Sequence, residues 1–91
     1  MIGYERGRLI KSKAGHDKCK LFVIIKAQGE YVYLVDGKTR KLDTPKKKNI
    51  KHIQLINYID DELASKLNSN RKIIDEDIKR AIKLFELQCK N

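Results

Sequence analysis

The chain has 91 residues, a mass of 10.6 kDa and a net charge of +9 from 21 basic and 12 acidic residues. A chain of this length forms a single domain and buries too little surface for a deep, water-excluding catalytic pocket. Its longest apolar run, Leu21–Ile25, is much shorter than the ~20 residues that span a bilayer. The first residues also lack the apolar core of a signal peptide. We therefore expect a soluble cytoplasmic protein with no membrane partner, in which Cys19 and Cys89 are reduced thiols.

The positive charge is confined to one part of the chain. Residues 1–55 contain 14 basic and 5 acidic residues, whereas residues 56–91 contain seven of each. A coding bias towards lysine would raise the total number of basic residues but would not place the excess on one side. A polyanion-binding surface does concentrate charge in this way. The distribution therefore predicts a nucleic-acid partner.

The same basic part has the composition of short strands. Gly7–Ser12 is a strand candidate, followed by a loop over Lys13–Lys18 that contains a glycine. Cys19–Ala27 is the strongest strand signal, because it is apolar and β-branched on both faces. Tyr31–Val35 and Lys38–Leu42 flank Asp-Gly, the preferred two-residue hairpin loop.

That hairpin would pair Tyr33 with Arg40 and place Tyr31 and Tyr33 on one face beside Lys38 and Arg40. Pro45 would then open a basic loop containing Lys46, Lys47 and Lys48. A last short strand near residues 50–55 would bring the number of strands to five.

The composition becomes helical after the last predicted strand. Residues 60–67 begin with acids and pair two leucines four residues apart, and residues 75–77 again place acids at a helix start. The apolar residues that follow recur at helical spacing, which predicts an amphipathic helix over 75–89. This stripe consists of Ile78, Ala81, Ile82, Phe85 and Cys89.

These elements predict a mainly β fold. We expect a small SH3-like five-stranded barrel over residues 1–58 and a helical C-terminal extension over residues 59–91. The helices would either pack on the barrel or form a tail.

Two segments carry a resemblance to a known family. Residues 7–25 look like a KOW motif, which is a strand, a loop with a key glycine and a second strand. Residues 35–42 and 45–55 continue the likeness to bacterial KOW-domain RNA-binding proteins, which are related to large-subunit ribosomal proteins of the archaeal and eukaryotic type. The likeness covers residues 5–58 and implies a barrel that binds RNA, including ribosomal RNA, in translation. Cys19 departs from the pattern, since we expect glycine or another small residue at that position.

The resemblance and the positions of basic residues together suggest the contact residues. Gly15 matches the motif glycine, which would let backbone amides approach a phosphate closely. Tyr31, Tyr33 and Arg40 form the available stacking patch for unpaired bases. The other readings are a plain turn glycine, a solvated lysine loop, and tyrosines that pack beneath a helix. The expected RNA-binding residues are Arg8, Lys11, Ser12, Lys13, Gly15, His16, Lys18, Lys46, Lys47, Lys48 and Lys51.

The sequence gives little support to a metal site or to catalysis. His16 and Cys19 have a plausible pair spacing for zinc, but only His52 and Cys89 remain as further ligands, and they have no pair spacing. The Ser, His and Asp of residues 12–17 are crowded into one turn that cannot adopt the geometry of a hydrolase triad. We therefore expect no enzyme activity, no metal and no cofactor.

Three functions remain, and they differ in their partner. The first is a non-catalytic RNA-binding protein that contacts ribosomal RNA or the large subunit. The second is a protein-interaction adapter of the transcription or translation machinery, which docks through the barrel or through the helix over 75–89. The third, duplex DNA binding, is the weakest, because no helix combines basic residues with a groove-reading face.

Overall fold

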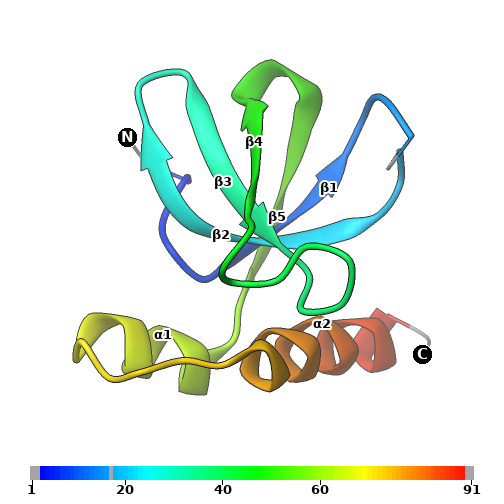
Figure 1. Cartoon of the computed structure of the whole chain (residues 1–91). Coiled ribbons are helices and arrows are strands. Elements are labelled where there is room, and N and C mark those ends of the chain that lie inside the picture. Colours follow the sequence, from blue (N-terminus) through cyan, green and yellow to red (C-terminus); the bar gives the residue numbers. More distant parts are fainter. Residues whose placement is uncertain (1–2, 17, 90–91) are drawn as a thin grey trace.

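The chain folds into one five-stranded antiparallel sheet followed by two helices (Figure 1). The structure is a computed structural model and describes residues 3–16 and 18–89. The elements are β1 (Arg8–Ser12), β2 (Leu21–Gln28), β3 (Tyr31–Val35), β4 (Lys46–Asn49), the 3₁₀ turn η1 (Ile50–His52), β5 (Ile53–Ile59), α1 (Asp61–Asn68) and α2 (Asp75–Cys89). The strand order is β4-β3-β2-β1-β5, which leaves β4 and β5 as the two edge strands of an open sheet. A mainly β fold with C-terminal helices is thereby confirmed.

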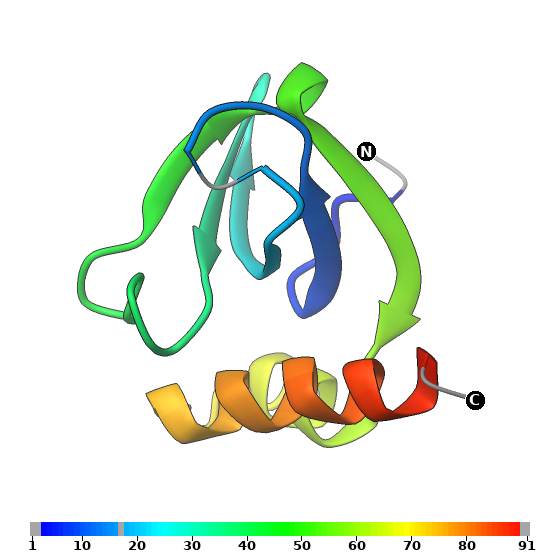
Figure 2. The ribbon, with the colours of Figure 1, turned by 90° about the vertical axis from the view of Figure 1, so that its right-hand side faces the viewer.

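Both faces of the sheet carry a hydrophobic core. Successive side chains of a strand point to opposite faces, and the buried residues of β1, β2 and β3 divide accordingly into two clusters. The strands curve around the first cluster, and the helices lie as a layer against the second (Figures 1 and 2). The first cluster consists of Ile10, Phe22, Ile24, Val32, Leu34 and Ile53. The second joins Leu9, Val23 and Val35 to Leu63, Leu67, Ile78 and Ala81.

The amphipathic stripe of α2 is used within the chain itself. Ile78 and Ala81 are fully buried, while Ile82 and Phe85 are half-buried against the same cluster. The ring of Phe85 lies 5.2 Å from that of Tyr58 on β5. The helices therefore pack on the sheet and do not form a detached tail.

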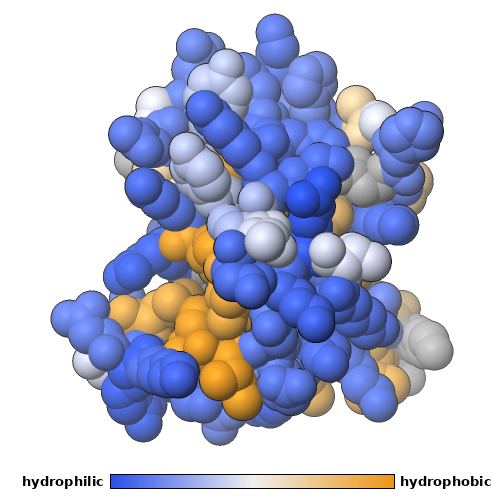
Figure 3. Space-filling view, in the orientation of Figure 1, coloured by the Kyte–Doolittle hydropathy of each residue, from blue (hydrophilic) through white to orange (hydrophobic). Residues whose placement is uncertain are grey.

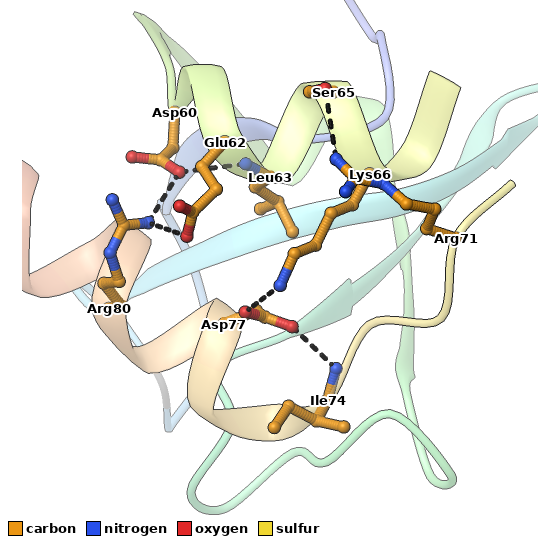
Figure 4. A network of polar contacts seen from close by, with 9 residues as sticks. All are labelled: Asp60, Glu62, Leu63, Ser65, Lys66, Arg71, Ile74, Asp77 and Arg80. Carbon is orange, nitrogen blue, oxygen red and sulfur yellow. Dashed lines mark hydrogen bonds and ion pairs between the residues drawn. The ribbon is translucent and has the colours of Figure 1, made fainter. Parts of the chain in front are cut away.

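Ion pairs join the two helices to each other (Figure 4). The buried Asp60 caps α1 by accepting a hydrogen bond from the Leu63 amide at 3.0 Å, and it also accepts one from Arg80 Nη1 at 3.0 Å. Lys66 of α1 donates to Asp77 of α2 at 3.0 Å. The network holds the helix pair in one arrangement against the sheet.

The hydrogen bonds of Asp77 indicate that the stability of the fold decreases in acid. Its Oδ2 accepts the Ile74 amide at 2.9 Å, and this bond and the bond from Lys66 lower the pKa of the carboxyl. A lowered pKa gives a stabilisation that is present above the unfolded value of ~3.9 and is lost as the pH falls through the folded value. Asp77→Asn is therefore expected to cost about 1 kcal/mol at pH 7 and progressively less below pH ~4. Urea denaturation from pH 7 to 3 measures this, with the exposed Asp43→Asn as the control, and a cost that stays constant with pH would contradict it.

The predicted Asp-Gly hairpin is wrong. Residues 38–42 form no strand, and β3 pairs instead with β4. Tyr33 lies opposite Lys47, and Leu34 lies opposite Lys46. The predicted lysine loop after Pro45 is therefore also wrong, because these lysines form the edge strand.

The side chain of Asp36 explains the difference. Its carboxylate accepts the amides of Lys38 and Arg40 and the hydroxyl of Thr39, all at 2.8 Å. Such local bonds compete with a strand ladder. A type I′ turn also needs positive φ at both central residues, and of the two only Gly37 has it, at +79°. The segment consequently forms a wide loop over residues 36–45, anchored to α2 by the Leu42 amide, which donates to Asp75 Oδ1 at 2.8 Å.

Three predicted strands also have different ends in the structure. The first strand begins one residue later than expected, and the second covers Leu21–Gln28 instead of Cys19–Ala27. The last strand is expected near residues 50–55, but η1 occupies residues 50–52 and β5 covers Ile53–Ile59.

Candidate nucleic-acid interface

The loop between β1 and β2 presents several of the predicted contact residues. Lys13, His16 and Lys18 are exposed, and Gly15 has a φ of +85°. This conformation favours glycine, and the Lys18 amide closes the turn by donating to the Gly15 carbonyl at 3.2 Å. Asp17, which belonged to the rejected triad, lies outside the described residues. The loop thus displays basic groups around a glycine turn, as expected from the sequence.

Cys19 adopts a left-handed backbone at the end of this loop. Its φ is +72°, and its amide donates to the Ser12 carbonyl at 2.8 Å. The one departure from the KOW pattern that the sequence shows therefore falls where the backbone favours glycine.

Cys19→Gly is expected to stabilise the protein. A left-handed residue with a Cβ costs ~1–2 kcal/mol, and the greater freedom of glycine in the unfolded chain offsets ~0.5–1 kcal/mol of the gain. The free energy of unfolding should rise by about 0.5–1 kcal/mol, measured by urea denaturation under reducing conditions. Cys19→Ala keeps the Cβ and serves as the control. A glycine variant less stable than the alanine variant would show that the conformation is not strained.

The three lysines of β4 have different environments because they alternate along a strand. Lys47 is exposed, whereas Lys46 and Lys48 are half-buried. Lys48 Nζ donates to Ser12 Oγ at 2.7 Å and to the Ala14 carbonyl at 2.8 Å. Ser12 is itself buried. Lys48 and Ser12 therefore tie β4 to the β1–β2 loop and position that loop.

Two tyrosines and two lysines share the outer face of β2, β3 and β4. The pairing places Lys26, Tyr33 and Lys47 in one row across the three strands. Lys47 Nζ lies 4.4 Å from the ring centroid of Tyr31, and Lys26 Nζ lies 5.4 Å from that of Tyr33. Tyr31 is 41% exposed. The pairing places Gln28, Tyr31 and Asn49 in a second row. We call the two rows together the aromatic–basic face, which consists of Lys26, Gln28, Tyr31, Tyr33, Lys47 and Asn49.

This face corrects the predicted stacking patch. Tyr31 and Tyr33 do share a side of the sheet, but their basic neighbours are Lys26 and Lys47 instead of Lys38 and Arg40. Arg40 lies in the 36–45 loop. The sequence prediction missed Lys26 because β2 contains a register shift between Ile24 and Lys26, which breaks simple alternation along the strand.

The remaining predicted contact residues do not join this face. Arg8 is half-buried and donates to the Ile56 carbonyl at 3.0 Å and to Glu5 Oε2 at 2.8 Å. Its hydrogen bond lowers the pKa of the Glu5 carboxyl. Lys11 and Lys51 are exposed, and Lys11 lines a groove with α2 on the helix side of the sheet. Arg8 is thus engaged within the chain, and Lys11 belongs to another surface.

The surface over the strands is mostly hydrophilic in the view of Figure 3, and apolar residues gather lower down beside the helices. Within residues 3–16 and 18–89, no three His, Cys, Asp or Glu side chains form a group that could hold a metal ion. No helix in this described part is long and apolar enough to span a bilayer.

Comparisons with known proteins do not add a family. Neither a scan with protein-family models nor a search of the curated proteins gives a match for the chain. The functional inference therefore depends on the residues and their arrangement.

Proposed function

We propose that this chain is a non-catalytic RNA-binding protein that contacts RNA through the aromatic–basic face and the β1–β2 loop. The observation that carries the proposal is the arrangement of Tyr31 and Tyr33, each with a lysine ammonium over its ring, on the outer side of three adjacent strands. The excess of positive charge in residues 1–55 supports it.

The chemistry of the face suits an unpaired strand. Lysines contact phosphates and contribute affinity without reading the sequence. An exposed tyrosine ring offers a stacking surface for a base, which a duplex keeps inside its own stack. Gln28 and Asn49 lie beside Tyr31. The Asn49 oxygen accepts the Lys51 amide at 3.0 Å, whereas the exposed Gln28 carries an amide donor and acceptor suited to base edges. We therefore infer that unpaired RNA is the preferred ligand.

We further infer that the sheet is an SH3-like barrel of the KOW type. Five strands in which the last returns to pair with the first support this inference, as does the Lys48 bridge from β4 to the β1–β2 loop. On this basis the RNA is ribosomal, and the protein acts in the cytoplasm on the ribosome or its large subunit.

The first test is the salt dependence of RNA binding. Four exposed lysines lie on the face or within residues 13–18 of the loop: Lys13, Lys18, Lys26 and Lys47. Four phosphate contacts with a single strand predict a slope of log affinity against log salt of about −3. Fluorescence anisotropy with a labelled single-stranded RNA between 50 and 200 mM salt should then show a loss of affinity of roughly 50-fold. The absence of RNA binding at 50 mM salt, or a slope near zero, would overturn the proposal.

An adapter role is a second candidate, and exposed leucines on α2 favour it. Leu84 is 38% and Leu87 is 51% exposed on the C-terminal half of the helix. Sedimentation of a cell lysate through a sucrose gradient separates the two functions. Loss of ribosome co-migration in Tyr31→Ala, with retention in a Leu84→Asp and Leu87→Asp double variant, would favour RNA binding. The reverse pattern would favour the adapter.

A further inference from the structure

A small basic cavity lies at the open side of β4, apart from the aromatic–basic face. Its volume is about 160 Å³, which is room for roughly five water molecules. Four segments contribute to it: the β1–β2 loop, β2, the 36–45 loop and the start of β4. The lining residues are His16, Lys20, Phe22, Thr39, Arg40 and Lys46.

The cavity combines a buried wall with exposed cationic side chains. Phe22 is buried and forms part of its wall. The backbone of Arg40 is fixed, since its amide donates to Asp36 Oδ1 at 2.8 Å and its carbonyl accepts the amides of Asp36 and Gly37 at 2.9 and 3.1 Å. The residues Lys20 and Arg40 are both exposed. Two basic side chains from distant parts of the chain therefore converge on one hollow.

No described residue that lines the cavity carries a carboxylate. Asp36 lies close by, and Thr39 donates its hydroxyl to it, but three donors already occupy the Asp36 carboxylate. These bonds outweigh the effect of burial and lower the pKa of Asp36. Convergent cations around a small hollow are suited to a compact anion with several acceptor oxygens, and guanidinium and ammonium groups bind phosphate oxygens strongly.

We propose that this cavity binds a phosphate monoester, the terminal phosphate of an RNA strand, an inference that rests on the proposed RNA-binding function. The charge of the site favours a monoester, which carries about −1.5 to −2 at pH 7, over an internal diester with a single charge. The position also fits. Consecutive side chains of a strand point to opposite sides, so Lys47 belongs to the aromatic–basic face and Lys46 to the cavity. Because β4 is an edge strand, an RNA strand stacked on the face reaches the cavity by turning around this edge.

The test compares one single-stranded RNA with a 5′-phosphate, with a 3′-phosphate and with hydroxyls at both ends. A terminal phosphate at one of the two ends is expected to increase the affinity of the wild type roughly ten-fold. Arg40→Gln should abolish this increase while leaving the affinity for the hydroxyl-ended RNA within about two-fold. Lys41→Gln, the same charge change at an exposed neighbour that does not line the cavity, should retain the increase.

Uridine 5′-monophosphate, followed by amide chemical shifts, separates this proposal from the proposed function. Equal affinity for all three RNAs overturns the cavity proposal and leaves RNA binding intact. Shifts confined to the lining residues without any RNA binding overturn the proposed function and leave the cavity as a site for free nucleotides. Absence of both effects overturns both. An increase that persists in Arg40→Gln places the terminal phosphate elsewhere and overturns the cavity proposal.

Discussion

Gly37→Ala is expected to lower the free energy of unfolding by about 2–4 kcal/mol. Gly37 is buried against α2 and has a φ of +79°. A Cβ at this position would lie 2.6 Å from the Asp75 carbonyl oxygen, 2.8 Å from Lys79 Cγ and 3.3 Å from the Lys79 amide nitrogen. Two of these atoms belong to the backbone of α2, so they cannot yield without a movement of the helix.

The cost has two parts that a control variant separates. A left-handed alanine costs ~1 kcal/mol wherever it stands, and forcing extra volume into packed structure costs a further ~1–3 kcal/mol. Gly29 has a φ of +60° with nothing within 4 Å of a Cβ. Gly29→Ala should therefore lose only the first part. Urea denaturation of both variants measures the difference, and equal losses would show that the approach of the 36–45 loop to α2 is not close in solution.

The same variant links the packing of the helix to the basic cavity. Gly37 and Arg40 belong to one loop, and the Gly37 amide donates to the Arg40 carbonyl at 3.1 Å. A shift of this loop away from α2 would also displace Arg40. We therefore expect Gly37→Ala to weaken the contribution of a terminal phosphate, whereas Gly29→Ala should retain it.

The parts of the fold that sequence predicts well are those with local signals. The apolar run in residues 21–25, the acids at positions 60–62 and 75–77, and the stripe that begins at Ile78 each predict an element that the structure contains. Periodicity and helix-start charges are contained within each segment and need no knowledge of the rest of the chain. The strand ends shifted because tight turns at Cys19 and η1 have no strong local signature.

The failures concern choices between competing partners. Asp36-Gly37 satisfies the hairpin pattern, but the Asp36 carboxylate and the contact of Gly37 with α2 select a wide loop. Lys46–Lys48 have the composition of a loop, yet they pair with β3. The bonds of Asp36 are local, but the contact of Gly37 with α2 and the pairing of β4 with β3 involve other segments of the chain, which a pattern within one segment does not contain. The candidate site changed for the same reason, since the neighbours of Tyr31 and Tyr33 follow from the pairing of β3.

Tyr31→Ala is expected to weaken the binding of single-stranded RNA roughly 5- to 100-fold, because stacking of one base on an aromatic ring contributes about 1–3 kcal/mol. Tyr31 is 41% exposed and lies outside both core clusters, so the fold should retain nearly all of its stability. Tyr31→Phe keeps the ring and should stay within a few-fold of the wild type. The slope of affinity against salt should be unchanged in both variants, because neither removes a charge.

Lys47→Gln should give the complementary result. Its ammonium is proposed to contact a phosphate, so the variant should reduce the salt slope by about 0.7–1 and weaken binding evenly across RNA sequences. Lys83→Gln removes the same charge from an exposed position on α2 and should leave both affinity and slope unchanged. Anisotropy titrations of the four variants at several salt concentrations therefore distinguish a stacking residue from a phosphate contact. If Lys83→Gln weakened binding as much as Lys47→Gln, the protein would bind RNA through its net charge alone, and the aromatic–basic face would not be the binding site.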